Sequence, residues 1–208
     1  IPTTRLQHIF RQAGGNDIAD KAAKINQGIV PSPIDGPNFH FIPFEEPEQA
    51  KRIIAELLAT GVRSKIDIDQ KADLQILTPM RKGPLGIFEL NAFLQELQNP
   101  GVARHRIMGV PWSDGDKVMQ IKNNYDKNVF NGDVGVIFKV HKSDDKVTVF
   151  YDDKTVEYEG DELEQLALAY ACTIHKSQGS EYPAVIVILD SSHYMMLQRN
   201  LIYTAITR

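Results

Sequence analysis

The hydrophobic periodicity of this chain changes twice, and that change limits the folds it can adopt. Up to about residue 109, segments with apolar residues at helical spacing, at 48–60 and 87–97, alternate with a compact apolar run, Leu74–Thr78. Between residues 110 and 162 the helical period is absent, and helix and strand signals resume at Leu163. Helices that alternate with short apolar strands are typical of a parallel sheet.

The middle segment has the pattern of a small antiparallel domain. Its short runs of β-forming residues, VMQI, VGVIFKV, VTVFY and TVEYE, are separated by turn sequences rich in Asn, Gly, Asp and Ser. Strands and hairpin turns at this spacing predict a barrel. The expected fold is therefore α/β. A parallel sheet flanked by helices is formed by residues 1–109 and 163–208, and a small antiparallel β-barrel is inserted at 110–162.

The remaining segments complete the α/β pattern. Residues 3–28 have helical spacing with a break at a Gly-Gly pair, and residues 39–44 (FHFIPF) alternate like a short strand that a proline ends or places at an edge. Near the end of the chain, residues 185–189 (VIVIL) form a second apolar strand, which we expect in the same sheet as the first. A last helix is expected to end at Arg208.

The composition points to a protein of a reducing compartment. Cys172 is the only cysteine, which excludes an internal disulfide framework and a zinc site made of cysteines. No apolar run approaches the roughly 20 residues that span a bilayer, and the six histidines lack metal-binding spacing, so no metal site is expected. The N-terminus shows neither a signal-peptide core nor an initiator methionine. We therefore expect a soluble, cytoplasmic piece of a longer polypeptide, without membrane contact.

The net charge of −4 is distributed unevenly along the chain. Residues 104–142 hold seven Lys and Arg against four Asp and Glu, whereas residues 143–164 hold two against nine. This distribution permits a basic face beside an acidic one. Solvated strands with incidental charges explain the pattern equally well, so charge alone does not decide whether the chain binds nucleic acid.

Two missing motifs are informative as well. A P-loop requires a Gly-Lys pair that closes a glycine-rich loop around phosphates, and the sequence contains no Gly-Lys pair. It also lacks an Asp-Glu pair after an apolar strand that would hold magnesium. This chain by itself therefore cannot bind a nucleotide in the manner of a P-loop protein.

The last part of the chain holds the most specific motifs. The polar loop TIHKSQGSE precedes the apolar strand at 185–189, and the chain closes with YTAITR. Loops at the ends of buried strands are where α/β sheets place ligand chemistry, and an arginine suits a phosphate. In this order the two segments resemble motifs V and VI of superfamily 1 DNA helicases of the RecD-like branch. The resemblance extends over essentially the whole chain. It includes the segment TPMRKGPLG and the segment GDKVMQIKNNYDKNVFNGDVGVI, which resembles the Src-homology-3-like barrel of these helicases.

The resemblance implies the second RecA-like motor domain of an ATP-dependent 5′→3′ DNA helicase, of the type called exodeoxyribonuclease V alpha chain. In that family ATP and Mg²⁺ are bound mainly by an N-terminal RecA-like domain that carries the P-loop. The implied partners are single-stranded DNA and that N-terminal domain of the same polypeptide. Further subunits and the biological pathway are not implied, and the fragment itself is expected to hold neither ATP nor magnesium.

The resemblance also assigns site residues, motif by motif. LQHIFRQA resembles motif IV and gives one γ-phosphate arginine, Arg11, and motif VI gives the second, Arg208; without the resemblance, both would be interpreted as surface arginines. The expected nucleotide contacts are Gln12, Gln178, Gly179 and Glu181. The expected DNA-binding residues, among which Asn91 holds its loop, are Thr78, Arg81, Lys82, Asn91, Thr173, His175, Lys176 and Ser177.

One loop of the predicted barrel is both aromatic and basic. Tyr125, Lys127, Asn128 and Phe130 could touch DNA, because aromatic side chains stack on bases. Equally, Phe130 could close the barrel while Lys127 is merely solvated. Trp112 is expected to pack at the junction between the barrel and the motor domain.

Two other functions fit the same sequence. The chain could be the helicase part of a conjugative relaxase, which a relaxase domain upstream would identify. It could also be a non-catalytic scaffold whose barrel binds a protein tail. The presence of Arg11, Glu181 and Arg208 argues against a relic motor. A nuclease is not expected, since no cluster of carboxylates for a nuclease metal site is visible.

Overall fold

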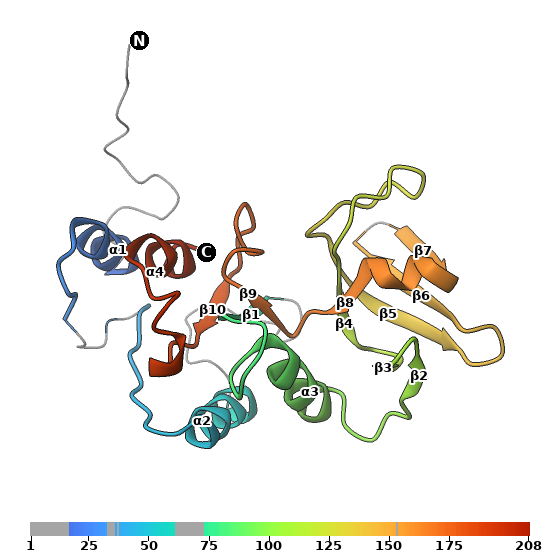
Figure 1. The fold of residues 1–208 in the computed structure, drawn as a ribbon, viewed down its shortest axis with the longest axis horizontal. Coiled ribbons are helices and arrows are strands. Elements are labelled where there is room, and N and C mark those ends of the chain that lie inside the picture. Colours follow the sequence, from blue (N-terminus) through green and yellow to red (C-terminus); the bar gives the residue numbers. More distant parts are fainter. Residues whose placement is uncertain (1–16, 33–35, 37, 61–72, 153) are drawn as a thin grey trace, which may run out of the picture.

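The structure is a computed structural model that describes residues 17–32, 36, 38–60, 73–152 and 154–208 (Figure 1). Its elements, in chain order, are α1 (Asp17–Gln27), α2 (Pro47–Thr60), β1 (Leu74–Thr78), α3 (Ile87–Gln98), β2 (His105–Ile107), β3 (Val110–Trp112), β4 (Lys117–Gln120), β5 (Val134–His141), β6 (Lys146–Tyr151), β7 (Lys154–Glu159), the 3-10 helix η1 (Gly160–Gln165), β8 (Leu166–Leu168), β9 (Ala171–Thr173), β10 (Ala184–Val187), the 3-10 helix η2 (Ser191–His193) and α4 (Arg199–Ile206).

A three-stranded parallel sheet forms the centre of the α/β part, in the order β10-β1-β9. Every residue of β1 is buried, because helices cover both faces of the sheet. One of its polar side chains, Gln75, donates from its amide to the carbonyl of Ala169 at 3.2 Å, while its buried side-chain oxygen has no hydrogen-bond partner among the described residues. The pairing of β1 with β10 confirms the prediction that these two distant apolar runs share one sheet.

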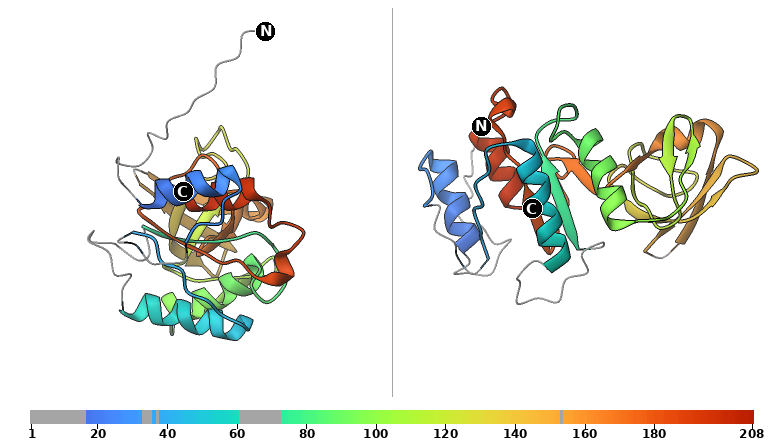
Figure 2. Two further views of the ribbon diagram at one scale, coloured as in Figure 1. Left: turned by 90° about the vertical axis from the view of Figure 1, so that its left-hand side faces the viewer. Right: turned by 90° about the horizontal axis from the view of Figure 1, so that it is seen from below.

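The helices form two layers around this sheet (Figures 1 and 2). On one face α2 and α3 pack through Ile54, Leu90 and Leu94 against Leu74 and Ile76 of β1. On the other face α4 buries its apolar side, and α1 in turn packs on α4. The alternation of side chains along β1 explains the arrangement, since successive residues of a strand point to opposite faces.

The antiparallel part is a five-stranded sheet in the order β7-β6-β5-β4-β8, accompanied by the hairpin β2-β3. Its core consists of Ile107, Trp112, Val118, Val129, Ile137, Val140, Val147, Val149, Tyr151, Val156, Tyr158, Leu163 and Leu166. Trp112 is 1% exposed within this core. The prediction that it packs at the domain junction is therefore wrong: the β2-β3 hairpin turns its indole into the antiparallel domain.

Strand pairing extends the antiparallel sheet beyond the predicted boundary at residue 162. Strand β8, Leu166–Leu168, pairs with β4, and only two residues separate it from β9 of the parallel sheet. The helix expected to resume at Leu163 is instead the short 3-10 helix η1. Strand-to-strand hydrogen bonds between residues far apart in sequence decide such a boundary, and no local pattern indicates them.

Three further predictions concern the edges of the α/β part. Two of them differ from the structure, and one falls only partly within the described residues. Residues 39–44 form no strand; Phe41 and Ile42 are 56% and 46% exposed, and Pro43 has no N–H for a ladder. The last helix, α4, ends at Ile206 rather than at Arg208. Of the helix predicted at 3–28, the described portion is α1, and the rest lies outside the described residues.

Asp116 lies where the antiparallel domain meets α3. Its side chain is fully buried, and its carboxylate accepts hydrogen bonds from Gln95 Nε2 (2.6 Å), Asn99 Nδ2 (2.9 Å), the backbone N–H of Ser113 (2.8 Å) and the Tyr170 hydroxyl (3.0 Å). Burial, together with the charge of Asp116, raises the pKa of Tyr170, so that this hydroxyl keeps its proton and donates. Asp116 thus ties α3 and the connection between β8 and β9 to the antiparallel domain.

Candidate functional site

The candidate site lies at the carboxyl ends of neighbouring parallel strands. Thr78, at the end of β1, is paired in register with Thr173, at the end of β9. The loop that follows each strand therefore leaves the sheet at the same edge, which is the usual place for ligands in α/β sheets. The two sets of predicted DNA contacts, almost a hundred positions apart in sequence, are in this way brought together.

The loop after β1 is fixed by buried groups. The Thr78 hydroxyl donates to the carbonyl of Leu85 at 2.8 Å. A side chain at Gly86 would meet the backbone of Lys82 at 2.6 Å, so this close approach requires glycine. Arg81 and Lys82 remain exposed on the outside of the turn. The loop is thus fixed by buried contacts, and its two basic side chains are exposed to solvent.

Asn91 connects α3 to the strand that leads into the second loop. Its side-chain amide donates to the carbonyl of Ala171 (2.9 Å) and to that of Ile87 (2.8 Å), and its oxygen accepts from the N–H of Ala171 (2.9 Å). Because Asn91 is only 6% exposed, the structure does not place it to contact DNA directly. It holds β9 against α3.

The loop after β9 has an inner and an outer set of side chains. Thr173 and Ser177 point inward: the Thr173 hydroxyl accepts from the N–H of Lys176 at 3.3 Å, and the Ser177 hydroxyl donates to the carbonyl of Ile174 at 2.8 Å. His175 and Lys176 are exposed.

Four of the residues predicted for the DNA site have buried side chains. Thr78, Thr173, Ser177 and Asn91 are hydrogen-bonded to the backbone and shape the two loops, as was expected of Asn91, and DNA contact by the other three stays a prediction. The outward-facing candidates are Arg81, Lys82, His175 and Lys176.

Positive charge is concentrated between these loops. Partial burial, and then the charge of Arg81, lower the pKa of Lys176, which shows that the two cations lie near each other across the two loops. Within the described part of the chain, neither Arg81 nor Lys176 forms a salt bridge. A site of this kind attracts an anion such as a phosphate.

Arg208 packs against the second loop through hydrogen bonds. Its guanidinium donates to the carbonyls of Ser177 and Ser180, each at 3.4 Å, and to that of Thr204 at 3.1 Å. The N–H of Tyr182 donates to the Arg208 carbonyl at 3.0 Å. The predicted nucleotide-side residues Gln178, Gly179 and Glu181 are exposed on this same loop. The structure thus gathers the residues of both C-terminal motifs around one turn.

Some candidate residues lie elsewhere or have other roles. Arg11 and Gln12 lie outside the described residues, so their roles stay predictions. Cys172 is buried in β9, and burial raises the pKa of its thiol to about 11, which suits packing and not nucleophilic chemistry. Among the described residues no group of three or more His, Cys, Asp and Glu could hold a metal ion, and no described helix could cross a membrane.

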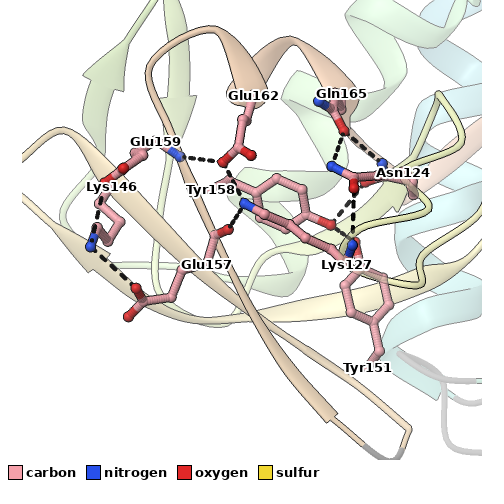
Figure 3. A network of polar contacts seen from close by, with 10 residues as sticks. Asn124, Lys127, Lys146, Tyr151, Glu157, Tyr158, Glu159, Glu162 and Gln165 are labelled. Atoms are coloured by element: carbon pink, nitrogen blue, oxygen red, sulfur yellow. Dashed lines mark hydrogen bonds and ion pairs between the residues drawn. The ribbon is translucent and has the colours of Figure 1, made fainter.

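The aromatic and basic loop of the antiparallel domain is largely committed to that domain (Figure 3). The Lys127 ammonium contacts the carboxylate of Glu162 and the carbonyl of Glu157, and it lies 5.2 Å from the centre of the Tyr158 ring. The hydrogen bond from Lys127 lowers the pKa of Glu162. Lys127 is therefore not merely solvated as one alternative predicted.

The aromatic side chains of that loop face outward. Phe130 is 40% exposed and does not close the domain; Val129, beside it, is fully buried in the core. Tyr125 is 76% exposed and contacts Phe130 edge to face, with the ring centres 5.9 Å apart.

Sequence reasoning missed Asp116 and Gln95, whose buried contacts hold the two domains together. No sequence signal indicated this burial, because Asp116 lies in the polar stretch SDGDK and Gln95 lies beside Glu96, and such residues are usually solvated.

Comparison with known proteins shows which families this chain resembles. Residues 90–151 match the SH3 domain of ATP-dependent RecD-like DNA helicases, and residues 168–208 match the C-terminal domain of UvrD-like helicases. The chain is 40% identical over 207 residues to the ATP-dependent RecD2 DNA helicase of Deinococcus radiodurans; the alignment covers 100% of this chain and 27% of that protein. It is 33% identical over 134 residues to the RecBCD enzyme subunit RecD of Mycolicibacterium smegmatis, covering 64% of this chain and 23% of that subunit.

Solved structures show the same fold. Bacteroides Pif1 bound to ssDNA superposes with a TM-score of 0.60 at 19% identity, covering 97% of this chain and 48% of that one. Pif1 helicase from Candida albicans gives 0.58 at 19% identity, covering 97% and 53%. The fold is thus a RecA-like parallel sheet flanked by helices with an SH3-like antiparallel domain, and the matched segments are similar to those of RecD-like and UvrD-like helicases.

The particular proteins that the chain resembles are RecD-like helicases, over residues 90–151 by family model and over its whole length by similarity to RecD2. The chain spans about a quarter of the length of the curated relatives it matches, 27% and 23% for the two above.

Proposed function

We propose that this chain is the second motor domain of an ATP-dependent 5′→3′ DNA helicase. In this proposal the exposed cations Arg81, Lys82 and Lys176 bind the backbone of single-stranded DNA. Arg208 faces ATP held by an N-terminal RecA-like domain of the same polypeptide. The observation that supports it most is the single loop after β9, which exposes Lys176 and accepts hydrogen bonds from Arg208 through the carbonyls of Ser177 and Ser180.

This loop offers a short route from nucleotide to DNA. Arg208 donates to the carbonyls of Ser177 and Ser180, one and four positions after Lys176. A change in where the guanidinium points, on ATP binding or hydrolysis, would alter those hydrogen bonds and with them the turn that presents Lys176. Charge rearrangement at a transferring phosphoryl group is what an arginine of this kind stabilises.

ATP with Mg²⁺ supplies the free energy of translocation in the whole enzyme. The residues of this chain proposed to contact the nucleotide are Arg208, Gln178 and Glu181, together with Arg11 and Gln12. A cytoplasmic location belongs to the same proposal, because ATP and DNA are both available there. The residues immediately upstream of Ile1 test the proposal directly: a P-loop and an Asp-Glu pair are expected there.

The 208-residue chain by itself should not hydrolyse ATP. It has no P-loop, although its contiguous cores should let it fold. The measurement is phosphate release with and without single-stranded DNA, with circular dichroism to confirm the fold. DNA-stimulated turnover by this purified chain would show that the nucleotide site is complete without a second domain.

In the full-length enzyme, Lys176→Ala should weaken binding to single-stranded DNA. Losing one phosphate contact should reduce the slope of log K against log salt concentration by about 0.7. Fluorescence anisotropy with labelled oligo-dT at several salt concentrations gives both values. Lys142→Ala, at an exposed turn of the antiparallel domain, is the matched control and should leave the slope unchanged. Equal slopes for the Lys176 variant and the wild type would remove Lys176 from the DNA site.

A further inference from the structure

An exposed aromatic ring stands beside the cations of the proposed DNA site. Phe88, in the first turn of α3, is 52% exposed. The guanidinium carbon of Arg81 lies 5.5 Å from the centre of its ring, a cation–π distance. The backbone holds the two side chains together, because the N–H of Phe88 donates to the carbonyl of Arg81 at 3.3 Å.

Packing does not account for this ring. Helix α3 builds the core with Leu90 and Leu94, which are fully buried on its inner face. Phe88 lies outside that core and leaves half of its surface in water. Contact between an apolar ring and water is unfavourable, so a ligand that covers the Phe88 ring would gain free energy by removing that surface from water.

The surroundings of Phe88 suit a ligand that is both flat and anionic. Lys176, on the neighbouring loop, lies near enough to Arg81 for that charge to lower its pKa. Neither cation has a carboxylate partner within the described chain. Flat rings linked by phosphates are the chemistry of a nucleic-acid strand, and single-strand sites combine cations with aromatic stacking platforms.

We propose that Phe88 and Arg81 form a stacking platform for one base of the bound single strand, while Lys176 contacts a neighbouring phosphate. This inference rests on the proposed function and adds a base contact to its backbone contacts. Because every base has an aromatic face, such a platform holds the strand without reading its sequence.

The other exposed aromatic pair, Tyr125 and Phe130, fits this role less well. Those two rings contact each other edge to face, so each partly covers the other. The nearby ammonium of Lys127 is already engaged by Glu162 and by the carbonyl of Glu157 (Figure 3). The loop therefore lacks the unpaired cation that Phe88 has in Arg81.

The test compares two ligands of equal length and charge, oligo-dT and a strand made of abasic sites, bound to the full-length enzyme. Phe88→Ala should weaken oligo-dT binding roughly 5- to 150-fold, which corresponds to one stacked base. Its salt slope should not change, since no phosphate contact is lost. On the abasic strand, Phe88→Ala and wild type should bind equally. Phe88→Trp should bind oligo-dT as the wild type does. Tyr194→Ala, which removes another exposed ring, should have no effect on binding.

The outcomes separate this inference from the proposed function. If the wild-type enzyme binds neither ligand, the proposed function itself fails. If the wild type binds both ligands and Phe88→Ala binds oligo-dT as tightly, the platform is overturned. Equal losses of affinity for both ligands would also overturn the platform, provided that circular dichroism shows the variant to be folded. If Phe88→Ala loses its fold, Phe88→Leu takes its place, because leucine keeps apolar volume but offers no aromatic face.

Discussion

Arg208→Ala in the full-length enzyme should lower ATP turnover by roughly 10³-fold or more while single-stranded DNA binding stays nearly intact. An arginine supplied across a domain interface acts mainly when charge shifts onto the phosphoryl oxygens, and removing it costs roughly 10³–10⁵ in rate. Arg208 is held against the 174–182 loop by bonds to the carbonyls of Ser177 and Ser180, and in the proposal it faces ATP while Lys176 contacts the DNA. Its loss should therefore affect turnover much more than binding.

The measurement pairs DNA-stimulated ATPase assays with anisotropy binding on the same preparations. Arg208→Lys should recover only part of the rate, because an ammonium lacks the planar pair of donors of a guanidinium. Arg199→Ala is the matched control, since Arg199 is an exposed arginine at the start of α4, the helix that precedes Arg208. If Arg208→Ala kept its turnover and lost DNA affinity, the nucleotide and DNA sides of the loop would be the reverse of those proposed.

Asp116→Ala should lower the free energy of unfolding by about 3–5 kcal/mol, which is the usual cost of removing one partner from a buried charged network. The substitution removes one buried acceptor from each of Gln95, Asn99, Ser113 and Tyr170; the amides of Gln95 and Asn99 keep their bonds to the carbonyls of Pro111 and Asp114. Each unsatisfied buried group costs about 1–3 kcal/mol, and neighbouring losses are not simply additive. The antiparallel domain and α3 should come apart first.

Urea unfolding of the 208-residue chain measures this effect. The single tryptophan, Trp112, is 1% exposed in the antiparallel core, so its fluorescence reports unfolding there. Asp116→Asn should also destabilise, because its amide places donors opposite donors. Asp126→Ala, at an exposed position, is the control and should change stability by less than about 0.5 kcal/mol. An Asp116→Ala variant as stable as the wild type would show that the cluster does not join the domains.

The sequence by itself determined the order of elements and the class of fold. Apolar spacing predicted α2, α3 and β1, and the loss of that spacing predicted the antiparallel strands β4 to β7; the structure has all of them. These features are local, because a helix and a strand each impose their own period on the residues that face the core. The motif order predicted the resemblance to RecD-like helicases, which the comparisons confirm.

Only the tertiary structure determined which candidate side chains are exposed. Asn91 is buried because it bonds Ala171, 80 positions away. Thr78 and Ser177 are turned inward by carbonyls of their own loops, and Phe88 became a candidate only once Arg81 lay against it. A motif fixes the type of residue, whereas the direction of a side chain depends on hydrogen bonds and packing that form only when distant segments meet. The sheet boundary at β8 and the burial of Asp116 have the same cause: contacts between residues far apart in sequence leave no local period to read.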